Sequence, residues 1–310
     1  MRNENGAGGI DSTCAYTQLA RGDARVEAQC RSELPLILFT LLCSASVGVV
    51  GAAIPLRLIS SVSVWLPALC LVLVFVGMVA SVVHLAKPLR APTSLRNLAS
   101  SWLSREILIV FAYWGSLAVW LYALVIGLSS VAVVLNLVSL ALGICLVLAM
   151  ARAYKVHAQP LWFGPESSWE LFACSLGVGI PLALAFSGDA LPVLITYVLA
   201  CAAMLGAATL YMHADTHRAL RVANPETPRE HAALDRLNEL VARRGRVLAL
   251  LTLASFTCLL LAALALFVDY LSSSGLIVPC GVSVIAFYFA RDRFYEMAVL
   301  CRPAVLRRMR

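Results

Sequence analysis

The sequence predicts an all-α protein, a polytopic membrane helix bundle with eight transmembrane helices. Hydrophobic residues make up 61% of the 310-residue chain, charged residues make up only 13%, and the mean hydropathy is +0.86. A soluble domain would have roughly 25% charged residues. The apolar residues also form runs long enough to cross a bilayer, which takes about 17–25 residues per helix. The core is therefore expected to be a set of apolar helices in lipid.

Eight apolar runs predict the eight helices. They cover residues 34–56, 63–84, 106–127, 130–151, 170–187, 190–212, 246–268 and 272–290. Short links rich in Gly, Ser and Asp separate the third run from the fourth, the fifth from the sixth and the seventh from the eighth. Such links favour tight turns, so these three pairs are expected to form antiparallel hairpins.

The remaining segments define the domain organisation. Residues 1–32 form a polar N-terminal tail, residues 33–297 the transmembrane domain, and residues 298–310 a basic C-terminal tail. The N-terminal tail has no early apolar core, so we expect no cleavable signal peptide and an uncleaved first membrane segment.

The long loop at 213–245 predicts an amphipathic helix over about 227–244. Thr227 to Glu230 read as a capping box with Pro228 at the first helical position, and Gly245 can end the helix. The helix either lies along the membrane surface or a partner, or simply connects two spans.

The charged residues predict the orientation of the chain. Every Lys and Arg except Arg57 falls in the tails and loops of one face or directly at their border, while the opposite face has Arg57, Asp189 and Asp269. Positively charged loops stay on the cytoplasmic side, so both termini are expected to be cytoplasmic. This rule also explains the net charge of +7 without any nucleic acid.

The ten cysteines predict neither a metal site nor an iron–sulfur cluster in this chain. No two of them form a CxxC pair, and most lie inside apolar runs. Iron–sulfur clusters need grouped thiolates, whereas an isolated Cys in an apolar helix behaves as a small buried hydrophobic residue.

The loop after the second run contains the candidate site. The segment 84–108 reads HLAKPLRAPTSLRNLASSWLSREIL, with His84 at the end of the second run and Glu106 at the start of the third. An antiparallel pair of helices would bring both residues to the same membrane edge. There they could flank a pocket for a lipid-soluble substrate that loses protons, such as a quinol, because His and a partly desolvated Glu can both accept protons.

A purely structural interpretation also fits these residues. Ser104 is a candidate N-cap, which would put Glu106 in the first helical turn, where a carboxylate is favoured. His84 would be an imidazole at a helix C-terminus. Arg90 and Arg105 could orient a quinone oxygen or a partner's carboxylates, or they could be ordinary positive charge of the cytoplasmic face.

The same stretch resembles the membrane-anchor subunits of anaerobic dimethyl sulfoxide reductases, the DmsC-like family. The resemblance covers about residues 33–297. The pattern is carried by His84-Leu85, Pro88, Arg90-Ala91, Ser94-Leu95, Leu103-Ser104 and Glu106-Ile107. Weaker matches are Glu33 to Thr40, Met150 to Arg152 with Tyr154, Pro160 to Trp162, and Arg291 with Arg293, Phe294 and Tyr295.

The resemblance implies a role in anaerobic respiration in a bacterial cytoplasmic membrane. An anchor of this family binds menaquinol as substrate and passes its electrons to an iron–sulfur partner subunit. A second partner holds a molybdenum–bis(pterin guanine dinucleotide) centre and carries out the terminal reduction, so the anchor binds neither cofactor and is not itself the terminal enzyme. The quinol-binding residues of the family correspond by position to His84 and Glu106, with Arg90 and Arg105 in the same loop.

The orientation departs from the family pattern. Well-known members place this loop and the soluble partners outside the cytoplasmic membrane, whereas here the loop lies on the strongly basic face. Either the complex faces the cytoplasm or docking charges override the usual bias, and we expect the cytoplasm.

Two other functions compete with this interpretation. A secondary transporter would have interrupted helices around a site in the middle of the bilayer, and Pro181 and Pro279 could break helices, but no charge or repeat marks such a site. A haem-binding cytochrome b would need axial His ligands within the helices. Only His84 and His213 lie near helix ends, and the other three histidines are in loops.

Overall fold

The structure is a computed structural model that describes residues 34–59, 62–84, 98, 101–153, 166–186, 250, 253, 254, 257, 261 and 277–306. Throughout these residues every regular element is a helix, which confirms the all-α prediction. The helices are α3 (Leu34–Ile59), α4 (Trp65–His84), α6 (Trp102–Val125), α7 (Ser129–Ala153), α8 (Glu166–Cys174), the π-helical turn η4 (Ser175–Gly179), α9 (Ile180–Ala185) and α12 (Ile277–Leu306).

Four helices in the described part are long and apolar enough to cross a membrane. These spans are Leu34–Leu56, Trp65–Val82, Trp102–Val125 and Ser129–Ala153, and a shorter apolar helix covers Glu170–Ala185. They correspond to the first five predicted runs. The predicted run 190–212, the loop helix at 227–244 and the tail 1–32 lie outside the described residues, and only isolated residues of the run 246–268 are described.

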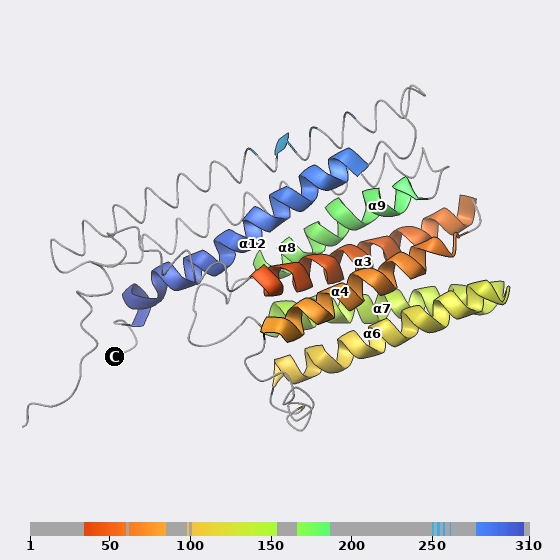
Figure 1. Ribbon diagram of the computed structural model, residues 1–310, viewed down its shortest axis with the longest axis horizontal. Helices are drawn as coiled ribbons and strands as arrows, with labels where there is room; N and C mark the ends of the chain where they lie inside the picture. The colour runs from red at the N-terminus through yellow and green to blue at the C-terminus, as the bar shows by residue number, and fades with distance from the viewer. Residues whose placement is uncertain are drawn as a thin grey trace, which may run out of the picture.

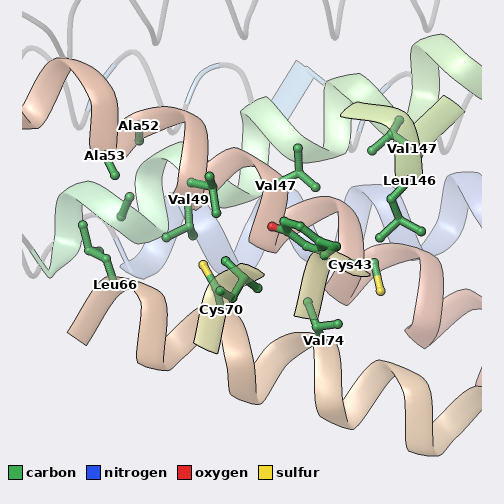
Figure 2. Packing of buried hydrophobic residues seen from close by; sticks show 14 of the residues in the cluster. Cys43, Val47, Val49, Ala52, Ala53, Leu66, Cys70, Val74, Leu146 and Val147 are labelled. Carbon is green, nitrogen blue, oxygen red and sulfur yellow. The ribbon is translucent and has the colours of Figure 1, made fainter. Parts of the chain in front are cut away.

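Helix α3 lies at the centre of the described bundle. It packs against α4, α7, α8, η4, α9 and α12 (Figure 1). Its spanning segment is 78% buried, against 28–33% for the spans of α4, α6 and α7. Figure 2 shows side chains of α3, such as Cys43 and Val49, in one apolar cluster with Cys70 and Val74 of α4. The outer faces of α4, α6 and α7 expose large apolar side chains, as expected of faces that contact lipid.

A tight turn joins α6 to α7 and confirms the predicted hairpin. Gly127 has a φ of 77°, a left-handed conformation that glycine adopts without a Cβ penalty. The Leu128 N–H donates to the Ala123 carbonyl at 2.9 Å and the Gly127 N–H to the Leu124 carbonyl at 3.2 Å. These two bonds form a Schellman motif, which satisfies the last carbonyls of α6 and reverses the chain.

The fifth apolar run is continuous rather than broken at its proline. Pro181 lacks a backbone N–H, and its ring would clash with the carbonyl four residues earlier in a regular α-helix. The chain adopts the wider π-helical turn η4 just before this proline and continues as α9. Pro279 is the third residue of α12, where a proline is tolerated because the first turn lacks intrahelical N–H bonds.

The π-helical turn packs directly against the backbone of α3. A Cβ added to Gly48 would overlap the Ser175 carbonyl oxygen, and one added to Gly179 would overlap the Ala45 carbonyl oxygen. Only glycine permits this approach, which fixes the position of α8 and α9 against the central helix.

Helix α12 is longer than its predicted apolar run. It begins at Ile277 and ends at Leu306, so part of the predicted C-terminal tail is helical. Figure 1 shows the C-terminal part of α12 reaching beyond the end of the other labelled helices.

Candidate functional site

The site is built around the start of α6. The helix begins at Trp102, and the Ser101 hydroxyl caps it by accepting a hydrogen bond from the Ser104 N–H at 3.4 Å. The predicted cap at Ser104 is therefore wrong, and Ser104 is a buried residue within the helix. Glu106 consequently lies beyond the first turn, so the helix dipole alone does not explain a carboxylate at this position.

The Glu106 side chain is directed into the bundle. It is only 6% exposed and lies on the same buried face of α6 as Val110 and Tyr113. Its carboxylate interacts electrostatically with Arg291 of α12 and with the Cys43 thiol of α3. A buried ionisable group at the end of an apolar span is costly, which makes it a candidate for a functional group.

A buried ion pair accompanies Glu106. The Arg291 guanidinium of α12 donates to the Glu170 carboxylate of α8 at 3.4 Å, and the two side chains are 3% and 1% exposed. We refer to Glu106, Glu170 and Arg291 as the charged cluster. Its members are far apart in the sequence and come from three helices.

Sequence reasoning missed two of these three residues. Glu170 is the first residue of the fifth predicted run, and Arg291 directly follows the eighth. Both positions fall at the same predicted membrane edge as Glu106, and this shared edge is the signal that could have found them. The runs themselves do not indicate which helices lie side by side at that edge.

The other predicted site residues differ in how the structure places them. His84 is the last residue of α4, at the same end of the bundle as the start of α6 (Figure 1), but its side chain is outside the described part of the protein. Arg90 also lies outside the described residues.

Arg105 has contacts on a different side of α6. Its Nε donates to the Leu98 carbonyl at 2.8 Å, and its Cζ lies 4.5 Å from the centre of the Trp102 ring. The Arg152 Cζ of α7 lies 5.2 Å from the same ring. Two guanidinium groups thus stack on one tryptophan at the bundle edge, an attractive cation–π arrangement that joins α6, α7 and the preceding loop.

A second polar group lies deeper in the bundle and contains no charge. The Tyr113 hydroxyl is 3.1 Å from the Ser46 hydroxyl, and the Ser116 hydroxyl is 2.9 Å from that of Ser139. We call these four residues the neutral polar core. Further along the same helices, the side chains of Asn136 and Trp120 are buried, and their amide and Nε1 atoms have no hydrogen-bond partner among the described residues.

The cysteines follow the predicted pattern in part. Cys43, Cys70, Cys174 and Cys280 are buried, whereas Cys145 is exposed. Across the described ranges, no three metal-ligating side chains of His, Cys, Asp or Glu gather in one place.

The fold and the site define a polytopic integral membrane protein of helices, with ionisable side chains buried at one edge of the bundle. The family described as DMSO reductase anchor subunit (DmsC) matches residues 29–286 of this sequence. Because this match covers most of the 310 residues, the protein belongs to the DMSO reductase anchor subunit family.

Two curated relatives agree with this assignment. The sequence is 30% identical over 164 residues to the C subunit of the anaerobic dimethyl sulfoxide reductase of Haemophilus influenzae, an alignment that covers 49% of this protein and 58% of the relative. It is 31% identical over 167 residues to the YnfH subunit of an anaerobic dimethyl sulfoxide reductase of Escherichia coli, covering 49% of this protein and 57% of the relative. The aligned region thus spans little more than half the length of each relative. No solved structure matches the sequence.

Proposed function

We propose that this protein is an eight-helix anchor that binds menaquinol and passes its electrons to an iron–sulfur partner subunit. Family membership supports the anchor role. The observation that supports a quinol site is Glu106, a buried carboxylate at the bundle edge where α4 ends and α6 begins. In this proposal a third subunit, with a molybdenum–bis(pterin guanine dinucleotide) centre, reduces the terminal acceptor.

The proposed chemistry at the anchor is proton and electron release from a quinol. A menaquinol loses two protons and two electrons when it becomes menaquinone. Each O–H bond breaks with its electron pair remaining on oxygen, and the electrons then leave for the partner's iron–sulfur cluster. The Glu106 carboxylate accepts one proton and the His84 imidazole the other, because both groups can change protonation state.

Arg90 of the predicted loop and Arg105 of α6 have supporting roles in this proposal. Arg90 orients a quinone oxygen. Arg105 acts more indirectly, because its guanidinium is engaged by the Leu98 carbonyl and the Trp102 ring, where it holds the loop against the start of α6.

The proposed location is a bacterial cytoplasmic membrane, with both termini and the quinol site on the cytoplasmic face. The positive charge of that face supports this orientation. Quinol oxidised there would release its protons on the inside, so this step would add none to the proton gradient.

Inhibitor binding to the purified, assembled complex tests the quinol site. A fluorescent quinoline N-oxide, which mimics menaquinol, is titrated against wild type, His84→Ala and Glu106→Gln. Wild type is expected to bind stoichiometrically, and each variant at least about tenfold more weakly, since loss of one hydrogen bond to a charged group costs about 1.5–3 kcal/mol.

Arg152→Met is the matched control. It removes a cation at the same edge that lies on the Trp102 ring and is not a proposed proton acceptor, so it should bind like wild type. Equal affinity in wild type and both site variants, with the complex still assembled, would remove His84 and Glu106 from the quinol site.

A further inference from the structure

We propose that Arg291, held by Glu170, is the counter-charge of Glu106 and a positioning residue for the quinol site. This inference rests on the proposed function and extends it to two residues of helices α8 and α12. It makes the charged cluster one unit, in which one guanidinium is paired with Glu170 and also acts on Glu106.

The geometry of the charged cluster supports a common counter-charge. Arg291 is ion-paired to the Glu170 carboxylate at 3.4 Å, and at longer range its charge also acts on Glu106. All three residues are buried. Among the described residues, the thiols of Cys43 of α3 and Cys174 of α8 also interact with members of the cluster, and the Cys280 thiol of α12 interacts with that of Cys174.

Charge counting explains why the cluster suits a site that handles protons. With both carboxylates ionised the cluster has a net charge of −1, and with one proton bound it is neutral. Arginine stays protonated throughout, so only the carboxylates can take up this proton. Glu170 is in direct contact with the guanidinium, which favours its ionised form, and Glu106 is then the carboxylate that exchanges a proton with the quinol.

Burial makes the counter-charge necessary. An isolated carboxylate in an apolar interior is strongly unfavourable, whereas a nearby cation in a low-dielectric setting offsets much of that cost. Without Arg291, the ionised Glu106 that accepts a quinol proton would lack this compensation. Glu170 in turn holds the Arg291 guanidinium in place, so that the distance between the guanidinium and Glu106 stays constant.

The competing interpretation is that the ion pair only clamps α8 to α12. An ion pair that only joined α8 to α12 would stabilise the bundle, but its removal would leave the inhibitor affinity of an assembled complex unchanged. The experiment therefore measures inhibitor affinity only in complexes that co-purify with all their subunits.

A double-mutant cycle separates the two interpretations. The fluorescent quinoline N-oxide is titrated against wild type, Glu106→Gln, the paired variant Glu170→Gln/Arg291→Met, and the triple variant that combines them. The paired variant removes both charges of the ion pair together, so neither Glu170 nor Arg291 is left unpaired and only Glu106 loses its counter-charge. Arg152→Met is again the matched control and should retain wild-type affinity.

Coupling between Glu106 and the ion pair is the expected result. The paired variant should bind about tenfold more weakly than wild type, and the triple variant no more weakly than Glu106→Gln alone, because the counter-charge has no role once Glu106 is neutral. Wild-type affinity in the assembled paired variant would overturn the inference. A triple variant that binds about a hundredfold more weakly than wild type, which is the product of the two separate effects, would also overturn it.

A second variant keeps the test decisive if the paired variant does not assemble. Arg291→Lys keeps the charge but moves it, and its effect on quinoline N-oxide affinity is measured in the wild-type and Glu106→Gln backgrounds. An effect that is present in wild type and absent in Glu106→Gln supports the inference. An equal effect in both backgrounds, or no effect in either, overturns it. Failure of the proposed function is distinguishable, because then Glu106→Gln itself binds like wild type.

Discussion

The charged cluster and the neutral polar core are both buried, and both join helices, but they differ in what burial requires of them. The neutral polar core pairs hydroxyl groups at 2.9 Å and 3.1 Å, so its polar atoms find partners within α3, α6 and α7. The charged cluster buries two carboxylates and one guanidinium in α6, α8 and α12. Hydroxyl pairs are inexpensive to bury, whereas buried charges often contribute little net stability against an apolar alternative.

This difference separates packing from function along one helix face. Glu106 and Tyr113 share the buried face of α6 and are about 10 Å apart along its axis, at a rise of about 1.5 Å per residue. The hydrogen bond between Tyr113 and Ser46 is explained by helix packing alone. The buried Glu106 carboxylate, with a cation on α12, is better explained by a functional requirement for charge.

Breaking the ion pair on one side should have the largest effect on stability. Arg291→Met leaves Glu170 and Glu106 buried without a cation, so the free energy of unfolding should fall by about 3–5 kcal/mol. Titration of sodium dodecyl sulfate into the detergent-solubilised protein measures this change. The paired variant Glu170→Gln/Arg291→Met should recover most of the loss, and an equally unstable paired variant would contradict the assignment of the loss to unpaired charge.

A steric change where α3 meets η4 should have the next largest effect. Gly48→Ala forces a Cβ against the Ser175 carbonyl, so α3 and η4 must separate, at a cost of about 1–3 kcal/mol. The same detergent titration measures it. Gly115→Ala is the control because a Cβ there meets no atom within 4 Å, and comparable losses in the two variants would refute the close contact.

Removing one hydroxyl from the neutral polar core should have the smallest effect. Tyr113→Phe deletes the bond to Ser46, and such interhelical bonds in membrane proteins contribute on average about 0.6 kcal/mol. Quinoline N-oxide affinity in the assembled complex should stay at the wild-type value. A loss of affinity as large as that of Glu106→Gln would mean that the neutral polar core belongs to the quinol site, and the distinction between the two regions would fail.

Part of the candidate site was predictable from the sequence, namely Glu106, whereas the helix start and the Glu170–Arg291 pair were not. The hydropathy runs placed Glu106 at a bundle edge, and the sequence pattern around it indicated the family that the comparison confirmed. The helix start was misplaced because Ser101 and Ser104 are both acceptable caps, and only the observed hydrogen bond selects Ser101. Glu170 and Arg291 were not predicted as a pair because 121 residues separate them.

The sequence by itself determined the apolar helices that the structure describes and where α6 turns back into α7 at Gly127. These properties depend on local composition and backbone conformation. Only the tertiary structure decided that α12 packs on α8, that Gly48 meets the π-helical turn, and that Arg291 compensates Glu170 and Glu106. In lipid, apolar surfaces do not select their partners by hydrophobicity, so the choice of neighbouring helix depends on shape and on polar contacts that form only after the helices meet.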